Sequence, residues 1–122
     1  TRKESSAASD VYKRQHIACM GTDTVGKQEV EAELVARASV FTDEVAQAVT
    51  LGESQHAVAA GLVDAGSIVE IGQVVTGGHA GRTTPEEITL FDGTGVGLQD
   101  LAVASAIVDL AVRKGIATEV EF

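Results

Sequence analysis

The order in which strand-like and helix-like stretches alternate limits the possible folds of this chain most strongly. The β-rich stretches are 16–22, 39–42 and 87–91. The stretches with helical apolar spacing are 28–38, 44–64 with a break near Leu51 and Gly52, 68–75 and 97–114. Strands that alternate with helices usually form parallel sheets, because each crossover helix returns the chain to the same end of the sheet. We therefore expect an α/β fold with a wound parallel sheet. The alternating "ATEVEF" at 117–122 predicts a terminal strand.

The last predicted helix is apolar on two opposite faces. Leu98, Leu101 and Val108 fall on one face, and Ile107 and Leu110 fall on the other. A helix that is apolar all round has to be covered on both sides. In a chain of 122 residues this predicts contact with a partner subunit or with further sequence.

The charge of the chain is strongly acidic and unevenly spread. The net charge is −9, and from His16 onward five Lys and Arg stand against sixteen Asp and Glu. Such a surface repels phosphate backbones, so we expect no nucleic-acid partner. No apolar run reaches the roughly 18–20 residues that would span a bilayer, so no membrane partner is expected. The single Cys19 fits a reducing compartment, and we expect a cytoplasmic protein.

Residues 1–15 are polar throughout and have no apolar period. We interpret them as a non-native or disordered lead-in, with a natural flexible tail as the alternative. Strand character begins abruptly after Gln15.

The glycine-rich turn in "LFDGTGVGLQD" follows a predicted strand and precedes a helix, as a phosphate-binding loop would. A dinucleotide fingerprint needs G-x-G-x-x-G and an acid about 20 residues later. Here the glycines are Gly93, Gly95 and Gly97, one residue short, and no Gly-Lys-Ser/Thr motif is present. The turn is therefore not a phosphate grip. It either serves only to join strand and helix, or it also meets a ligand at the carboxyl edge of the sheet.

Asp23 follows the first predicted strand, and Lys27 comes four residues later on a glycine-containing turn. A carboxylate half-buried at a sheet edge can have a raised pKa and move protons. The alternative, which the spacing alone favours, is a helix-capping Asp and a surface Lys. The three histidines and the cysteine have no metal-ligand spacing, so we expect no metal site.

Three segments together resemble the C-terminal part of the ornithine cyclodeaminase/mu-crystallin family: "HIACMGTDTVGKQEV", "DEVAQAVTLGES" and "GHAGRTTPEEITLFDGTGVGLQDLAVA". The most specific matches are H-x-x-x-x-G-x-D-x-x-G-K and G-R followed by E-I-T-x-F-D-x-T-G. The resemblance covers residues 16–122.

The resemblance implies the second part of a Rossmann-type parallel sheet at 16–96. It also implies that the helix and strand of 97–122 belong to a dimerisation and substrate domain, and that the full-length protein is a homodimer. The phosphate-binding loop and the residues that hold the substrate carboxylate would lie upstream. The chain alone is then expected to be an inactive fragment.

The resemblance also assigns roles to individual residues. Asp23 matches the catalytic acid/base of the family. Cys19, Met20, Lys27 and Gly93 match positions that contact NAD or NADP, and Thr94 matches a position beside the substrate. This sequence departs from the family in having Val25 where Pro is usual and Gly93 where Ser is usual.

The implied activity is hydride transfer at the α-carbon of an L-amino acid through an imine. The first expectation is an ornithine cyclodeaminase, a lyase that forms proline and ammonia. The alternatives are an alanine dehydrogenase, a ketimine reductase acting on a cyclic imine, and a non-catalytic binding protein of the mu-crystallin kind. Asp23 would serve each of these enzymes, so it does not distinguish them.

Overall fold

The computed structural model describes residues 14–122 of the chain. Its centre is a four-stranded parallel sheet with the order β1-β4-β2-β3. The strands are β1 (His16–Cys19), β2 (Ser39–Thr42), β3 (Val69–Glu70) and β4 (Thr89–Asp92). The predicted α/β fold with a parallel sheet is confirmed. Apart from Arg14 and Gln15, the predicted lead-in 1–15 lies outside the described residues.

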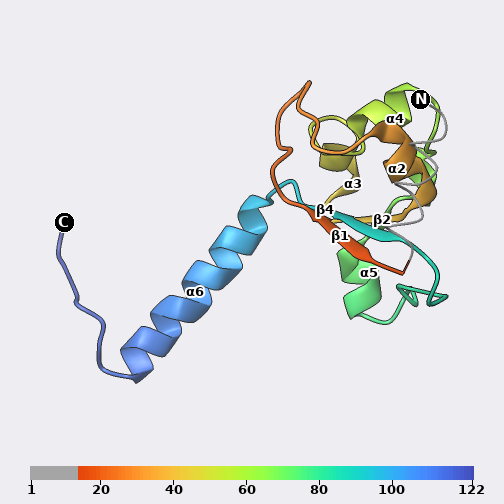
Figure 1. Cartoon of the computed structure of the whole chain (residues 1–122). Coiled ribbons are helices and arrows are strands. Elements are labelled where there is room, and N and C mark those ends of the chain that lie inside the picture. Colours follow the sequence, from red (N-terminus) through yellow and green to blue (C-terminus); the bar gives the residue numbers. More distant parts are fainter. Residues whose placement is uncertain (1–13) are drawn as a thin grey trace.

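Helices cover the sheet unequally on its two faces. The helices are α2 (Ala32–Arg37), α3 (Val45–Ala48), α4 (Gln55–Ala59), α5 (Ile71–Val75) and α6 (Gly97–Arg113), with a 3₁₀ turn η1 (Ala65–Ser67). Figure 1 shows α2, α3 and α4 on one side of the strands and α5 on the other. The crossovers therefore wind around the sheet as a parallel topology requires.

The core lies between the sheet and α2 and α4. Strand register places Ile17, Leu90 and Val40 side by side, because β4 pairs with both β1 and β2. Leu90 and Val40 pack with Val35 of α2 and Ala57 of α4 in one buried cluster. These side chains are small, so burial comes from close approach of the helices to the strands.

The opposite face of the sheet is less covered. Phe41 and Phe91 are paired in the register and belong to this face, and Ile71 and Val74 of α5 lie over it. Together these residues border an open hollow of about 410 Å³. His79 stacks edge-on against Phe41, with ring centroids 5.7 Å apart.

Several predicted boundaries are wrong. The helix predicted at 28–38 begins only at Ala32. The break predicted near Leu51 and Gly52 within 44–64 is found between α3 and α4, but both helices are shorter than the pattern suggests. The segment 68–75 contains the short strand β3 before α5, because Val69 and Glu70 pair with the end of β2.

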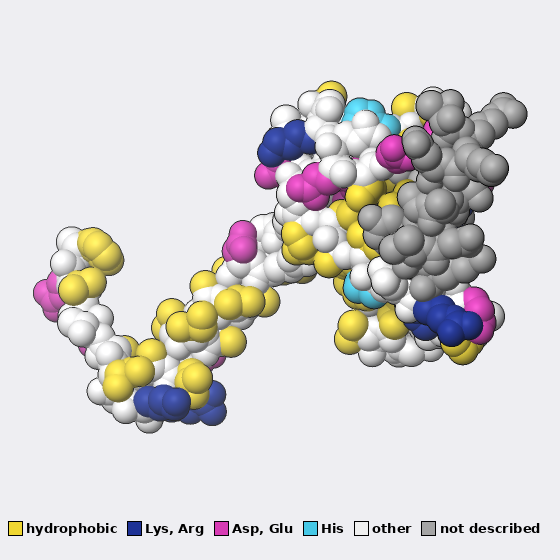
Figure 2. All heavy atoms as spheres, viewed as in Figure 1, with side chains coloured by type: hydrophobic (Ala, Val, Ile, Leu, Met, Phe, Trp, Pro, Cys, Tyr) yellow, Lys and Arg dark blue, Asp and Glu magenta, His cyan; other side chains and the backbone are white. Residues whose placement is uncertain are grey.

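The helix α6 extends away from the sheet, as Figure 1 shows. Its apolar side chains are exposed, among them Leu98 at 71%, Leu101 at 65% and Ile107 at 60%, and Figure 2 shows them along the projecting arm. The predicted terminal strand at 117–122 is not formed. A strand needs a neighbour to pair with, and α6 carries this segment away from the sheet edges. Within the described part of the chain, no helix is both long and apolar enough to cross a membrane.

Candidate functional site

The candidate site lies at the carboxyl edge of the sheet, where β1 and β4 end side by side. Cys19 and Asp92 are register partners, and the Gly93 N–H donates to the Cys19 carbonyl across 2.9 Å. The loop after β1 and the turn after β4 therefore start from adjacent points. Ligands of open parallel sheets bind at this edge.

Asp23 and Lys27 form an ion pair on the loop after β1. The Lys27 Nζ lies 2.8 Å from Asp23 Oδ1, and the Thr24 hydroxyl donates to the same oxygen at 3.1 Å. Among the described residues, no hydrogen bond reaches Oδ2. Both side chains of the ion pair are more than half exposed.

The hydrogen bond from Lys27 and then that from Thr24 lower the pKa of Asp23 below its ordinary value of 3.8. The alternative of a half-buried Asp23 with a raised pKa is therefore wrong, because the side chain is exposed and lies beside a cation; the surface Lys27 that the spacing favoured is found. Asp23 does not cap a helix, since the next helix begins at Ala32. The ion pair has little stabilising weight of its own at this exposure.

The Met20 side chain lies close to Gly93 at the ends of β1 and β4. Met20 is 65% exposed. A Cβ on residue 93 would lie 2.6 Å from Met20 Sδ and 3.1 Å from Phe91 Cε1. Glycine at this position thus lets the thioether lie across the strand end, and a serine would displace it.

Cys19, the neighbour of Met20, points into the core and is only 2% exposed. Burial, reinforced by the charges of Glu53 and Asp92, raises the pKa of its thiol to about 12. Its side chain is therefore an inert core group. What Cys19 can present at the site is its backbone.

Thr94 is buried in the turn after β4 and is held by Asp43 at the end of β2. The Thr94 hydroxyl donates to Asp43 Oδ1 at 2.6 Å, and the N–H groups of Thr94 and Gly95 donate to Oδ2 at 3.0 Å and 2.8 Å. Burial acts to raise the pKa of Asp43, but these hydrogen bonds outweigh it and the pKa is lowered. The glycine turn is thus fixed by a carboxylate of the neighbouring strand.

Two buried acids lie at this edge. The sequence places Asp92 at the end of its strand but does not show its burial, and Glu53 was missed. Asp92 and Glu53 are 0% and 1% exposed. The Asp92 carboxylate accepts the N–H groups of Glu53 and Ser54, each at 2.9 Å, and the Ser54 hydroxyl at 2.7 Å. For Asp92 the signal in the sequence is an acid at the end of a β-rich stretch, and such an acid is usually exposed. Glu53 lies between α3 and α4 and has no comparable signal.

The structure brings some of the predicted residues together. The Met20 thioether lies beside the position that a Cβ of residue 93 would take. Asp23 forms an ion pair with Lys27. Among residues 14–122, no hydrogen bond or ion pair joins Asp23 to the turn at 93–95. No group of three or more His, Cys, Asp and Glu in that range is arranged to hold a metal ion.

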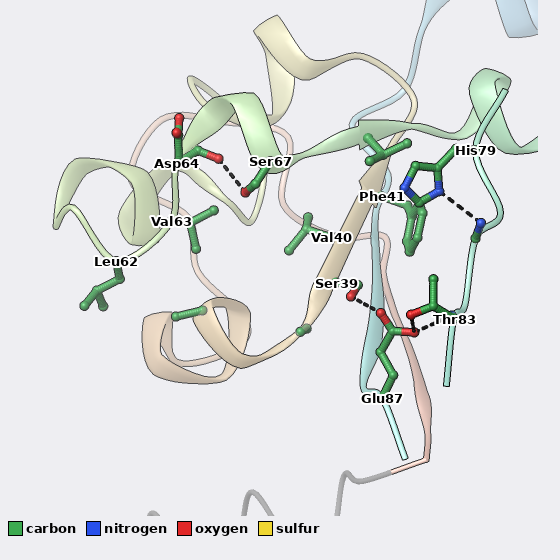
Figure 3. Close-up of a pocket in the computed structure, with 14 residues that line it drawn as sticks. Ser39, Val40, Phe41, Leu62, Val63, Asp64, Ser67, His79, Thr83 and Glu87 are labelled. Carbon is green, nitrogen blue, oxygen red and sulfur yellow. Dashed lines mark hydrogen bonds between the residues drawn. The ribbon is translucent and has the colours of Figure 1, made fainter. Parts of the chain in front are cut away.

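A separate pocket of about 320 Å³ lies at the opposite end of β2. Figure 3 shows Ser39 and Thr83 turned toward Glu87, and His79 bonded to the backbone beside it. The hydrogen bond from Ser39 lowers the pKa of Glu87, and His79 Nδ1 accepts the Gly81 N–H at 3.0 Å. None of the predicted site residues lines this pocket, so it is not part of the candidate site.

Residues 8–115 match the model of the ornithine cyclodeaminase/mu-crystallin family. The chain is 63% identical over 106 residues to the iminosuccinate reductase of Paracoccus denitrificans, a match that covers 87% of this chain and 33% of the reductase. The crystal structure of that reductase in complex with NAD⁺ superimposes with a TM-score of 0.83.

Two further relatives are similar at lower identity. The alanine dehydrogenase of Archaeoglobus fulgidus is 36% identical over 123 residues, which cover 100% of this chain and 38% of the dehydrogenase; a solved archaeal alanine dehydrogenase dimer with bound NAD gives a TM-score of 0.82, with 91% of this chain and 35% of that one covered. A probable ornithine cyclodeaminase from Bordetella pertussis gives 0.73 at 26% identity, over 88% of this chain and 35% of that one. The chain thus spans roughly a third of the length of these relatives.

Proposed function

The chain belongs to the ornithine cyclodeaminase/mu-crystallin family, and we propose that the full-length protein is an NAD(P)-dependent enzyme that reduces the imine of a short 2-oxo acid to the amino acid. Iminosuccinate, the imine of oxaloacetate, is the first substrate to test. The observation that carries this choice is the 63% identity to an iminosuccinate reductase, against 36% to an alanine dehydrogenase. Reduction of iminosuccinate gives aspartate.

The residues present suit the nicotinamide end of a dinucleotide. Gly93 has no side chain, and the exposed Met20 thioether lies over it, so a flat ring can approach the strand ends. A thioether is polarisable and packs well against aromatic rings. When bound, the dinucleotide supplies the hydride, which adds to the imine carbon while the nitrogen ends as an amine.

Asp23 is proposed as the group that handles charge and protons on the substrate nitrogen. Because its pKa is lowered, it is a carboxylate at neutral pH. A carboxylate stabilises a protonated imine and then the ammonium of the product. In the reverse direction the same carboxylate accepts a proton from the ammonium group. Its Oδ2, which takes no hydrogen bond from the described residues, is the oxygen proposed to face the nitrogen.

Lys27 holds Asp23 from the other side through Oδ1. This keeps the carboxylate ionised and fixes its orientation. A further contact from Lys27 to the cofactor is part of the proposal. It agrees with the exposure of about half of the Lys27 side chain.

Thr94 is proposed to border the substrate through the shape of its turn. Its hydroxyl proton is already donated to Asp43, so a ligand can use only the lone pairs of that oxygen. Asp43 holds this turn in place through the hydrogen bonds that it accepts from Thr94 and Gly95. A serine hydroxyl at residue 93, usual in the family, is absent here, and the proposed role of Gly93 is to leave room.

Homodimerisation through the C-terminal arm is also proposed. The α6 side chains Leu98, Leu101 and Ile107 are exposed, and an archaeal alanine dehydrogenase of the same fold is a dimer. An apolar helix of this kind is stable in water only when covered.

Cyclodeamination of ornithine is the second candidate. The likeness to a probable ornithine cyclodeaminase supports it, at 26% identity. The two activities differ in the direction of the first hydride transfer and in their products. The test is to supply the full-length protein with NADH, oxaloacetate and ammonium, and separately with NAD⁺ and ornithine. We expect NADH oxidation and aspartate in the first mixture and no proline in the second; the reverse result would select the cyclodeaminase. Binding of cofactor without turnover of either mixture, or of alanine, would select the mu-crystallin kind of role.

A further inference from the structure

The loop that carries Asp23 and Lys27 has no regular structure of its own. Residues 23–28 lie between β1 and α2 and are exposed throughout. An exposed loop of this kind has many conformations unless other groups hold it. The side chains that hold this one come from a single segment, Glu53 to His56, about thirty residues further along the chain.

Glu53 fixes both ends of the loop with one carboxylate. Its Oε2 accepts the Thr22 hydroxyl, immediately before Asp23. Its Oε1 accepts the N–H groups of Glu29 and Val30 at 2.9 Å and 2.8 Å, immediately after the loop. Glu53 is 1% exposed, so these hydrogen bonds replace its contact with water and cannot be lost cheaply.

Gln55 and His56 hold the middle of the loop. The Gly26 N–H donates to Gln55 Oε1 at 2.9 Å, and Gln55 Nε2 donates to the Thr24 carbonyl at 3.2 Å. His56 Nε2 lies 2.9 Å from the Lys27 carbonyl oxygen. The Thr22 hydroxyl before Asp23 and several backbone groups after it are therefore tied to the same short segment.

That segment is in turn fixed to the end of β4. Asp92 accepts the N–H groups of Glu53 and Ser54, and Gly52 lies so close that a Cβ there would be 2.7 Å from Asp92 Oδ1. The position of the Asp23 loop thus depends on the strand that also carries Gly93 and Thr94. Among the described residues, Asp23 makes no direct hydrogen bond to that turn. The Asp23 loop and the turn are nevertheless both anchored to the same strand, β4.

We propose that Glu53 is a positioning residue for the reaction. It acts through Thr22 and the amides of Glu29 and Val30 to hold the Asp23 carboxylate in register with the turn at 93–94. This inference rests on the proposed role of Asp23. Misplacing a reacting group by about 1 Å can reduce a rate by about 100-fold, so a loose loop would affect turnover more than ligand binding.

The test removes the hydrogen bond between Thr22 and Glu53 while it keeps the size of the side chain at residue 22. In the full-length enzyme, Thr22→Val keeps the shape of residue 22 and deletes the hydroxyl that Glu53 accepts. Thr22→Ser keeps the hydroxyl and is the rescue variant. Glu33→Gln, on the exposed side of α2, is the control for the carboxylate that Asp23→Asn removes, and it leaves activity unchanged. Each variant is measured for kcat and KM with the imine, for NADH binding by fluorescence, and for melting temperature.

We expect Thr22→Val to lower kcat by about 10- to 100-fold, with KM changed less and NADH affinity unchanged within about 2-fold. Thr22→Ser should restore most of the rate. The decisive arm repeats Thr22→Val in an Asp23→Asn background. If Glu53 acts through Asp23, the added Thr22→Val causes no further loss there, because the two changes are not additive. A general structural defect would lower the residual rate in both backgrounds.

Two results would overturn the proposal in distinguishable ways. If Asp23→Asn abolishes turnover while Thr22→Val behaves like wild type, Asp23 keeps its role and only the positioning fails. If Asp23→Asn is fully active, the proposed function of Asp23 fails and the positioning fails with it. Should Thr22→Val not fold, Glu53→Gln, which replaces one accepting carboxylate oxygen by an amide NH2 group, carries the same test: a kcat loss that vanishes in the Asp23→Asn background supports the proposal, and an unchanged kcat contradicts it.

Discussion

The carboxylate of Asp92, the last residue of β4, accepts the backbone N–H of Glu53 across 2.9 Å while both side chains are buried. Glu53 uses its own carboxylate to hold Thr22 and the amides after the Asp23 loop. Two acids of like charge are thus buried near each other, each satisfied by N–H and O–H donors. Buried carboxylates are tolerated when their acceptor capacity is used in this way.

Gly52 allows this contact, so replacing it should be costly. A Cβ at residue 52 would meet Asp92 Oδ1 at 2.7 Å and the backbone Cα of Ala48 at 2.8 Å. We expect Gly52→Ala to lower the free energy of unfolding by about 1–3 kcal/mol, as for overpacking. Gly72→Ala is the control, because nothing lies within 4 Å of its Cβ position; it should be neutral or stabilise by up to about 1 kcal/mol. Denaturant unfolding of the two variants checks this, and equal losses would contradict it.

Asp43 should make stability depend on acid pH. Its pKa in the folded protein is lowered from 3.8 because the hydrogen bonds from Thr94 and Gly95 outweigh burial. The unfolded state therefore takes up a proton first as pH falls. The contribution of Asp43 is present above the unfolded value of 3.8 and disappears as pH falls through the lower folded value.

We expect Asp43→Asn to be less stable than wild type at about pH 6, with the difference shrinking toward about pH 2. Unfolding free energies of both proteins across this range provide the measurement. A gap that stays constant with pH would show that Asp43 acts only through its shape.

Cys19 should be unreactive in the folded protein. Its thiol is 2% exposed and burial raises its pKa to about 12, so almost no thiolate is present at neutral pH. We expect the peptide that carries Cys19 to stay unmodified by iodoacetamide until denaturant is added, as followed by mass spectrometry. Rapid alkylation of the native protein would mean that β1 is open to solvent.

The apolar face of α6 should control the oligomeric state of the full-length protein. Leu101 and Val108 are 65% and 59% exposed in this chain. We expect Leu101→Glu combined with Val108→Glu to shift the proposed dimer to monomer in sedimentation velocity, because a charge cannot be buried there unpaired. Gln99→Glu, which adds a charge at an exposed polar position, is the control. A dimer that survives the double change would place the interface elsewhere.

Much of the sheet could be predicted from local patterns. The β-rich "SVFT" is β2 with the predicted bounds, and β1 and β4 fall within or next to predicted strands. β3 was missed because it has only two residues and exists through its pairing with β2. The terminal strand failed for the converse reason: "ATEVEF" has the right alternation, but no strand lies beside it. The apolar periodicity of a segment shows which of its faces is apolar, but it does not show which other strand pairs with it.

The candidate site could likewise be predicted only in part from the sequence. Asp23 and Lys27 were predicted as a pair, and the structure joins them at 2.8 Å. Their spacing favoured a surface Lys27 but left a raised pKa of Asp23 open, and only the exposure of the loop decides against it. Glu53 was missed and the burial of Asp92 was not predicted because acids are rarely buried, and only the three-dimensional approach of Gly52 and Ser54 reveals their partners.

We propose that hydride reaches the α-carbon of a short imino acid while Asp23 contacts the imine nitrogen. To test this, the full-length protein is given oxaloacetate, ammonium and NADH that carries deuterium at both C4 positions of the nicotinamide, and the aspartate is analysed by mass spectrometry. We predict aspartate with deuterium on its α-carbon from wild type, and a yield at least about 100-fold lower from Asp23→Asn, in the range for loss of an acid/base group. Aspartate without deuterium, or equal yields from the two proteins, would contradict the account.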